Sequence, residues 1–142
     1  MKIAVIDGQG GGIGKAVVER IRQVFGNDIE VLALGTNALA ASLMMKAGAN
    51  ECASGENAVC WNAGRVDVII GSIGIIAANA MVGELSPAMA AAIASSEAVK
   101  ILIPLNNYRM KVAGTRNEPL PHMIDEAMKI LEGILEAENE KS

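Results

Sequence analysis

The sequence predicts an α/β protein of the doubly wound type, with a mostly parallel sheet of five or six strands and helices on both faces. Runs of strand length that are apolar throughout alternate with segments of helical periodicity. The first of these runs ends in a glycine-rich turn that leads into a helix. The 142 residues suffice for one domain, which we expect to span residues 1–142, with a charged tail from about residue 137 that frays.

The first half of the chain begins with an apolar strand at residues 2–6. The helix that starts near residue 15 carries apolar residues at i, i+4 and i+7 from Val17, and Gly26-Asn27 ends it. The next strand, residues 30–34, is apolar after its first residue. It therefore reads as a central strand that is covered on both faces.

A second helix follows, with Thr36 or Asn37 as its cap and Gly48 as its end. Its inner face is expected to carry Leu39, Leu43 and Ala47. A weak strand near residues 50–53 and a short helix around residues 56–63 complete this part of the chain.

In the second half, a clear strand at residues 66–70 leads into Gly71-Ser72-Ile73-Gly74. An apolar helical segment is expected to about residue 82, and Ser86-Pro87 opens a helix to about residue 95. A strand at residues 99–103 follows.

The chain is then expected to form an edge strand at residues 110–113, where apolar and polar residues alternate, and a terminal helix from Pro121. The inner face of that helix is expected to carry Ile124, Met128, Leu131 and Leu135. The whole pattern is Rossmann-like, for which we expect the strand order 3-2-1-4-5-6. A ligand then binds where the order reverses, between residues 7–14 and residues 71–74.

Five of the seven residues in the run Gly8-Gln9-Gly10-Gly11-Gly12-Ile13-Gly14 are glycine. Glycine lets backbone N–H groups approach a phosphate at the positive end of a helix, and it tolerates positive φ. Each glycine also costs about 0.5–1 kcal/mol relative to alanine, a cost that an unused turn would not recover. We therefore predict that this run binds a phosphorylated ligand. The alternative is a tight turn that binds nothing.

Comparison of this glycine run with known phosphate-binding loops narrows the choice of ligand only in part. A Walker loop is excluded, because Gln9 and Ala16 stand where it needs a glycine and a magnesium-binding hydroxyl. The spacing Gly8-x-x-x-Gly12-Ile13-Gly14 resembles the turn of short-chain dehydrogenases, which implies an NAD(P) cofactor. The catalytic Tyr-x-x-x-Lys of that family is missing, since Lys111 follows Tyr108 by three residues and not four.

The whole chain resembles a family of short bacterial single-domain proteins with a Rossmann-like pattern, a domain of unknown function. The segments that carry this resemblance are residues 7–14, residues 71–81 and Ile103-Pro104-Leu105-Asn106. The resemblance covers nearly the full length. It implies the fold and no particular activity.

The end of the second strand bears on the choice of cofactor. NAD-binding domains usually place there an acidic residue that holds the ribose hydroxyls, whereas here Gly35-Thr36-Asn37 follows. Without that carboxylate we expect no strong preference for NAD over NADP, and a mononucleotide or another phosphorylated metabolite remains an alternative. Thr36 and Asn37 are candidate ligand contacts, with helix capping as the competing interpretation.

Other candidate ligand-binding residues are expected at the same edge of the sheet, where the strands end. Gly71 and Ser72 belong to the second loop, where Ser72 either donates a hydrogen bond to a ligand or forms a plain turn. Asn106, after the fifth strand, carries an amide that suits a carboxamide or a sugar. Asp7 is expected mainly to order the glycine turn, and Arg116 is the nearest cation for a phosphate unless it is simply solvated.

The amino-acid composition limits the classes of partner that we expect. The net charge of −4 and the scattered Lys and Arg residues argue against nucleic acid, and no apolar stretch reaches the roughly 18 residues of a membrane span. Cys52 and Cys60 match no metal or redox spacing, so we expect no metal and a cytoplasmic location. The 51% hydrophobic content, rich in Ala and Met over residues 77–94, favours a homo-oligomer, unless the sheet itself buries that surplus.

Three functional classes follow. A binding or sensing module is favoured, because the sole histidine, His122, lies away from Ser72 and no acid–base pair is evident. An NAD(P)-dependent oxidoreductase whose site is completed by a second subunit is the alternative. A structural subunit that binds no ligand is the third.

Overall fold

The computed structural model describes residues 1–105 and 109–141. Strands and helices alternate along the chain as the sequence predicts. In order they are β1 (Lys2–Asp7), α1 (Gly12–Phe25), β2 (Glu30–Gly35), α2 (Ala38–Lys46), β3 (Glu51–Ser54), α3 (Glu56–Ala63), β4 (Val68–Ser72), the short 3-10 helix η1 (Ile73–Ile76), α4 (Pro87–Ser95), β5 (Val99–Ile103) and α5 (Leu120–Lys141).

The strands form one parallel sheet in the order β3-β2-β1-β4-β5, which confirms the predicted order for five strands. β1 lies at the centre, where Val5 pairs with Ala33 of β2 on one side and with Ile70 of β4 on the other. The order reverses between β1 and β4. Their carboxyl ends therefore meet at the place where ligands bind in sheets of this kind.

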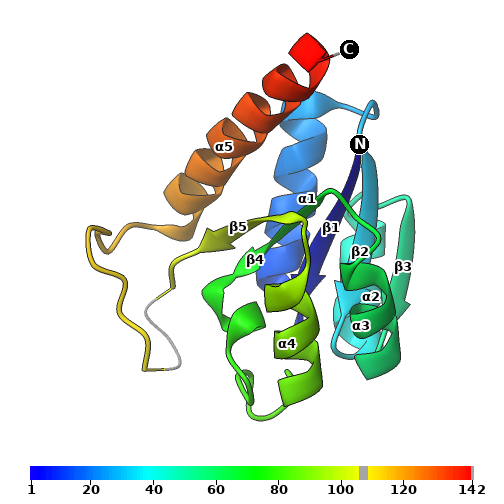
Figure 1. Ribbon diagram of the computed structural model, residues 1–142, viewed down its shortest axis with the longest axis vertical. Coiled ribbons are helices and arrows are strands. Elements are labelled where there is room, and N and C mark those ends of the chain that lie inside the picture. Colours follow the sequence, from blue (N-terminus) through cyan, green and yellow to red (C-terminus); the bar gives the residue numbers. More distant parts are fainter. Residues whose placement is uncertain (106–108, 142) are drawn as a thin grey trace.

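Helices cover both faces of the sheet, as Figure 1 shows. One buried cluster joins β1 and β4 to α1 and α5 through residues such as Val17 and Leu131. The other joins the opposite face to α3 and α4 through residues such as Val59 and Ile93. These two layers confirm the doubly wound α/β architecture.

The buried face of α2 differs from the prediction. Leu39 is 65% exposed, and the residues that face the core are Ala40, Ala41 and Met44. The reason is close packing against the end of β2, since a Cβ at Gly35 would lie 2.6 Å from the backbone nitrogen of Ala41. Only small side chains fit at that distance, so the helix turns its alanines inward.

Three further predictions need correction. The helix expected to about residue 82 is only η1, followed by turns in which Met81 and Val82 adopt positive φ. Residues 110–113 form no strand, because the carbonyl of Val112 is engaged in a turn by the N–H and hydroxyl of Thr115. The tail beyond residue 137 does not fray but continues α5, whose last residues are mostly strong helix formers.

Within the described part of the chain, no helix combines the length and the apolar character that a bilayer span requires.

Candidate ligand site

A buried carboxylate holds the turn between β1 and α1. Asp7 is 5% exposed, and its oxygens accept hydrogen bonds from the N–H groups of Gly8 at 2.8 Å and Gly14 at 2.7 Å. Desolvation raises the pKa of Asp7, and the backbone hydrogen bonds offset that effect only in part. The structure thus confirms that Asp7 orders the turn.

The glycines of the turn divide into two groups. A Cβ at Gly14 would meet the sulfur of Met44 and lie 2.8 Å from the Cβ of Asp7, and Gly11 has φ +76°. These positions require glycine for packing or backbone conformation. At Gly10 and Gly12 a Cβ would meet nothing within 4 Å. Steric fit therefore does not explain glycine at those two positions.

Most N–H groups of the turn already have partners within the protein. Gly11 donates to the carbonyl of Gly8 at 2.9 Å, and Gln9 donates to Oε1 of Glu84 at 2.9 Å. The N–H groups of Gly10 and Gly12 donate to no described residue. Gly12 is the first residue of α1, so its N–H lies at the positive end of that helix. These two groups are the donors available to an anion.

Ser72, the last residue of β4, supplies a third available polar group. It is 2% exposed, and its hydroxyl has no hydrogen-bond partner among the described residues. A buried polar group without a partner costs about 1–3 kcal/mol. The fold therefore keeps an unfavourable hydroxyl at the carboxyl end of a central strand.

A cavity of about 350 Å³ brings these groups together at the carboxyl ends of β1 and β4. The described residues that line it are Asp7, Gly8, Gln9, Gly10, Gly11, Gly12, Ile13, Ser72, Met81 and Leu120. No Lys or Arg is among them. The two loops that the sequence places at this crevice thus share one cavity, which Leu120, the first residue of α5, also lines.

A carboxylate that the sequence analysis missed lies at the end of β2. Oε1 of Glu84 accepts hydrogen bonds from the Thr36 hydroxyl and the Asn37 amide, both at 2.7 Å, in addition to the N–H of Gln9. The hydrogen bond from Gln9, followed by those from Thr36 and Asn37, lowers the pKa of Glu84. The expectation that no carboxylate lies at this strand end is therefore wrong. No local pattern could have revealed Glu84, which is 48 residues from Thr36.

Asn37 also caps α2, since its Oδ1 accepts a hydrogen bond from the N–H of Ala40 at 2.8 Å. The capping interpretation is thus confirmed for Asn37. Neither Asn37 nor Thr36 lines the cavity at the glycine turn. Both side chains instead bind the protein's own Glu84.

Two further residues considered from the sequence, Gly71 and His122, are not among the described residues that line this cavity. Gly71 lies inside β4, where a Cβ would be 2.7 Å from the carbonyl oxygen of Ile6. Asn106 lies outside the described residues. His122 is exposed in the first turn of α5.

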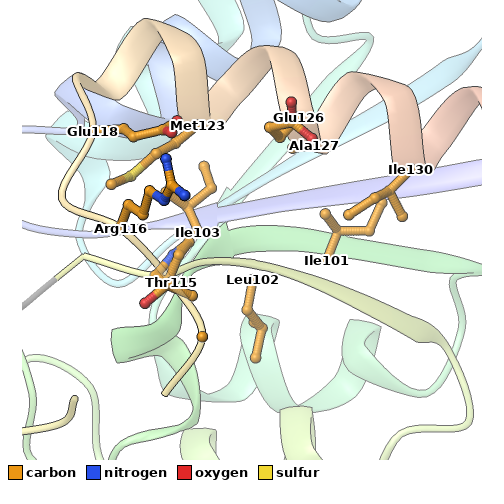
Figure 2. A pocket seen from close by; sticks show the side chains of 12 residues that line it. Ile101, Leu102, Ile103, Thr115, Arg116, Glu118, Met123, Glu126, Ala127 and Ile130 are labelled. Carbon is orange, nitrogen blue, oxygen red and sulfur yellow. The ribbon is translucent and has the colours of Figure 1, made fainter. Parts of the chain in front are cut away.

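Arg116 lines a second cavity, of about 450 Å³, between β5 and α5. Figure 2 shows it beside Ile103, Met123 and Glu118. Arg116 is therefore not among the residues of the glycine-turn cavity.

A protein-family model covers nearly the whole chain. Residues 2–136 match the family model described as "Domain of unknown function (DUF3842)". Comparison with curated proteins and with solved structures gives no match.

Proposed function

The chain belongs to the DUF3842 family, a domain of unknown function, and from its site we propose that it binds a phosphorylated ligand as a binding or sensing module. The ligand's phosphate accepts hydrogen bonds from the N–H groups of Gly10 and Gly12 at the start of α1. Another polar group of the ligand bonds the hydroxyl of Ser72. The ligand class is a nucleotide or another phosphorylated metabolite.

The observation that carries this proposal is the Ser72 hydroxyl, which has no hydrogen-bond partner among the described residues. Glycines at a helix start can be a packing solution, and part of this turn is one, as Gly14 illustrates. Ser72 is only 2% exposed, it lies on the wall of the same cavity, and its hydroxyl has no partner among the described residues, so burying it has no structural benefit of its own. A ligand that hydrogen-bonds Ser72 removes the cost of burying it.

Binding is favoured over catalysis by the groups that line the cavity. Among the described residues that line it, Asp7 carries the only ionisable side chain, and its oxygens are engaged by backbone N–H groups. A serine nucleophile needs an adjacent base, and the lining residues that the structure describes include no His or Lys. An NAD(P)-dependent oxidoreductase would need a second subunit to supply that chemistry, and it is an outcome that turnover assays would reveal.

We also propose that the protein forms a homo-oligomer. In the Ala/Met-rich segment, Met89, Ala90 and Ile93 are buried in the hydrophobic core of the domain. Part of the surplus of hydrophobic residues is therefore internal. The outer face of α4 is nevertheless uncharged, and large apolar side chains are exposed elsewhere, such as Trp61 at 56% and Ile130 at 54%. Neither nucleic acid nor a membrane is proposed as a partner. The two free cysteines suit a reducing cytoplasm.

The first experiment is native mass spectrometry of freshly purified protein, followed by calorimetry with a panel of phosphorylated compounds. We expect at least one compound to bind, and Ser72→Ala to weaken it about 5- to 10-fold through the loss of one hydrogen bond. Equal affinity in both proteins for every compound that binds would remove Ser72 from the site. The same mass spectra report the subunit number, and a 14.7 kDa species alone would contradict the oligomer.

A further inference from the structure

We propose that the site takes a compact phosphorylated ligand and excludes a dinucleotide, because the protein's own Glu84 and Met81 fill the space in which an adenosine would lie. This inference rests on the proposed function and specifies its ligand. It concerns the space between the glycine turn and the end of β2.

In dinucleotide-binding sheets, the adenosine ribose lies at the end of the second strand, beside the first glycines of the turn. In this protein the polar groups at that place are already engaged. The Thr36 hydroxyl, the Asn37 amide and the N–H of Gln9 all donate to one oxygen of Glu84. The Glu84 carboxylate thus occupies the donors that a ribose or its phosphate would use.

Met81 fills the space next to these donors. Its sulfur lies 2.6 Å from the position that a Cβ on Gly8 would have, and its side chain is only 3% exposed. Gly8 is therefore glycine because the 77–85 loop packs onto it. A ribose that approached the backbone of Gly8 would have to displace Met81.

Contacts within the protein define the conformation of the 77–85 loop. Leu85 is fully buried, and its carbonyl accepts a hydrogen bond from Asn79 at 2.7 Å. Met81 and Val82 adopt φ of +60° and +56°, which is rare for any side chain and rarer for a β-branched one. Strained backbone of this kind persists only where surrounding contacts determine it. Val82 is exposed, but Met81 is only 3% exposed and thus forms part of the wall of the site.

The space that remains suits a small ligand. The cavity of about 350 Å³ is bounded by Met81 and is also lined by Gly10, Gly12 and Ser72. That volume is near the lower end of the range for ligand pockets, about 300–1,000 Å³. A phosphate bearing a short hydroxylated or carbonyl-containing body matches these three groups.

The test is calorimetry on the full chain with ribose 5-phosphate, glycerol 3-phosphate, inorganic phosphate, unphosphorylated ribose and NAD. We expect at least one compact phosphate to bind at least tenfold more tightly than both ribose and NAD. Gly12→Asp and Ser72→Ala should each weaken that binding. Binding that neither variant alters, or no binding by any compound, would overturn both this inference and the proposed function.

Variants of Glu84 distinguish a failure of this inference from a failure of the proposed function. If Glu84 and Met81 fill the adenosine space, Glu84→Ala should narrow the gap between NAD and the compact phosphate at least threefold, and Glu97→Ala should not. Glu97 is an exposed acidic residue before β5, at the opposite end of the sheet, so it controls for net charge. An unchanged gap would overturn the role given to Glu84. Tight NAD binding in the wild type, lost in Gly12→Asp and in Glu84→Ala, would overturn the inference, make Glu84 a ribose ligand and leave the proposed function intact.

Discussion

Replacing Gly12 with aspartate places a negative charge where the phosphate is proposed to lie. A Cβ at this position meets nothing within 4 Å, so the new side chain fits without displacing a neighbour. Gly12 is also the first residue of α1, where an acidic side chain stabilises a helix. We therefore expect unchanged or slightly higher stability together with weaker ligand binding.

The size of the effect follows from the repulsion between two anions. A carboxylate within about 4 Å of a phosphate costs about 1 kcal/mol in bulk water and about 4 kcal/mol at the effective dielectric constant near a protein surface. An intermediate value of about 2 kcal/mol corresponds to a roughly 30-fold loss of affinity. Gly12→Asn is the matched control, because it adds a side chain of the same size without the charge.

Calorimetry measures the affinity of the wild type, Gly12→Asp and Gly12→Asn for the phosphorylated ligand that binds the wild type most tightly. Thermal unfolding checks that each protein is folded. Aspartate should weaken binding about 30-fold, and asparagine should weaken it less than about threefold. Equal losses in the two variants would attribute the effect to size instead of charge. No loss in either variant would refute the reasoning, because the ligand would then not lie against the start of α1.

The remaining predictions concern stability. Ser72→Ala removes a buried hydroxyl that has no partner in the described part of the chain, so the variant's melting temperature should equal or exceed that of the wild type in the absence of ligand. Gly14→Ala should cost about 1–3 kcal/mol in urea unfolding, because its Cβ would crowd Asp7 and Met44, whereas Gly10→Ala should cost less than about 1 kcal/mol. Hydrogen bonds lower the pKa of Glu84 in the folded protein below its ordinary value of 4.5. Near pH 4.5 the unfolded state therefore binds more protons at Glu84 than the folded state does. The stability advantage of wild type over Glu84→Gln should therefore be present above about pH 4.5 and shrink as the pH falls through the lowered pKa, and an advantage independent of pH would contradict this assignment.

The sequence was sufficient for the fold because its signals are local and mutually consistent. Apolar runs buried on both faces mark the parallel strands, and caps such as Asn37 and Ser86 mark the starts of helices. The strand order followed from general topology rules. Where side-chain contacts decide the outcome, the predictions failed, as in α2, whose buried face is set by packing between Gly35 and Ala41.

The site was predictable only in its backbone component. The glycine turn and Ser72 end neighbouring strands, so topology alone brings them together. Glu84 was missed because its contacts join three segments that are distant in sequence, and they depend on the irregular 77–85 loop. Backbone in which Met81 and Val82 adopt positive φ carries no propensity signal, since neither residue favours that conformation.

Amide NMR of the ¹⁵N-labelled protein, titrated with the tightest compact phosphate, tests the central claim most directly. Binding at the glycine turn predicts large, saturable shifts of the Gly10 and Gly12 amides, with smaller shifts around Ser72. Shifts that do not saturate, or that are confined to residues of the second cavity such as Arg116, would contradict a phosphate site at the start of α1.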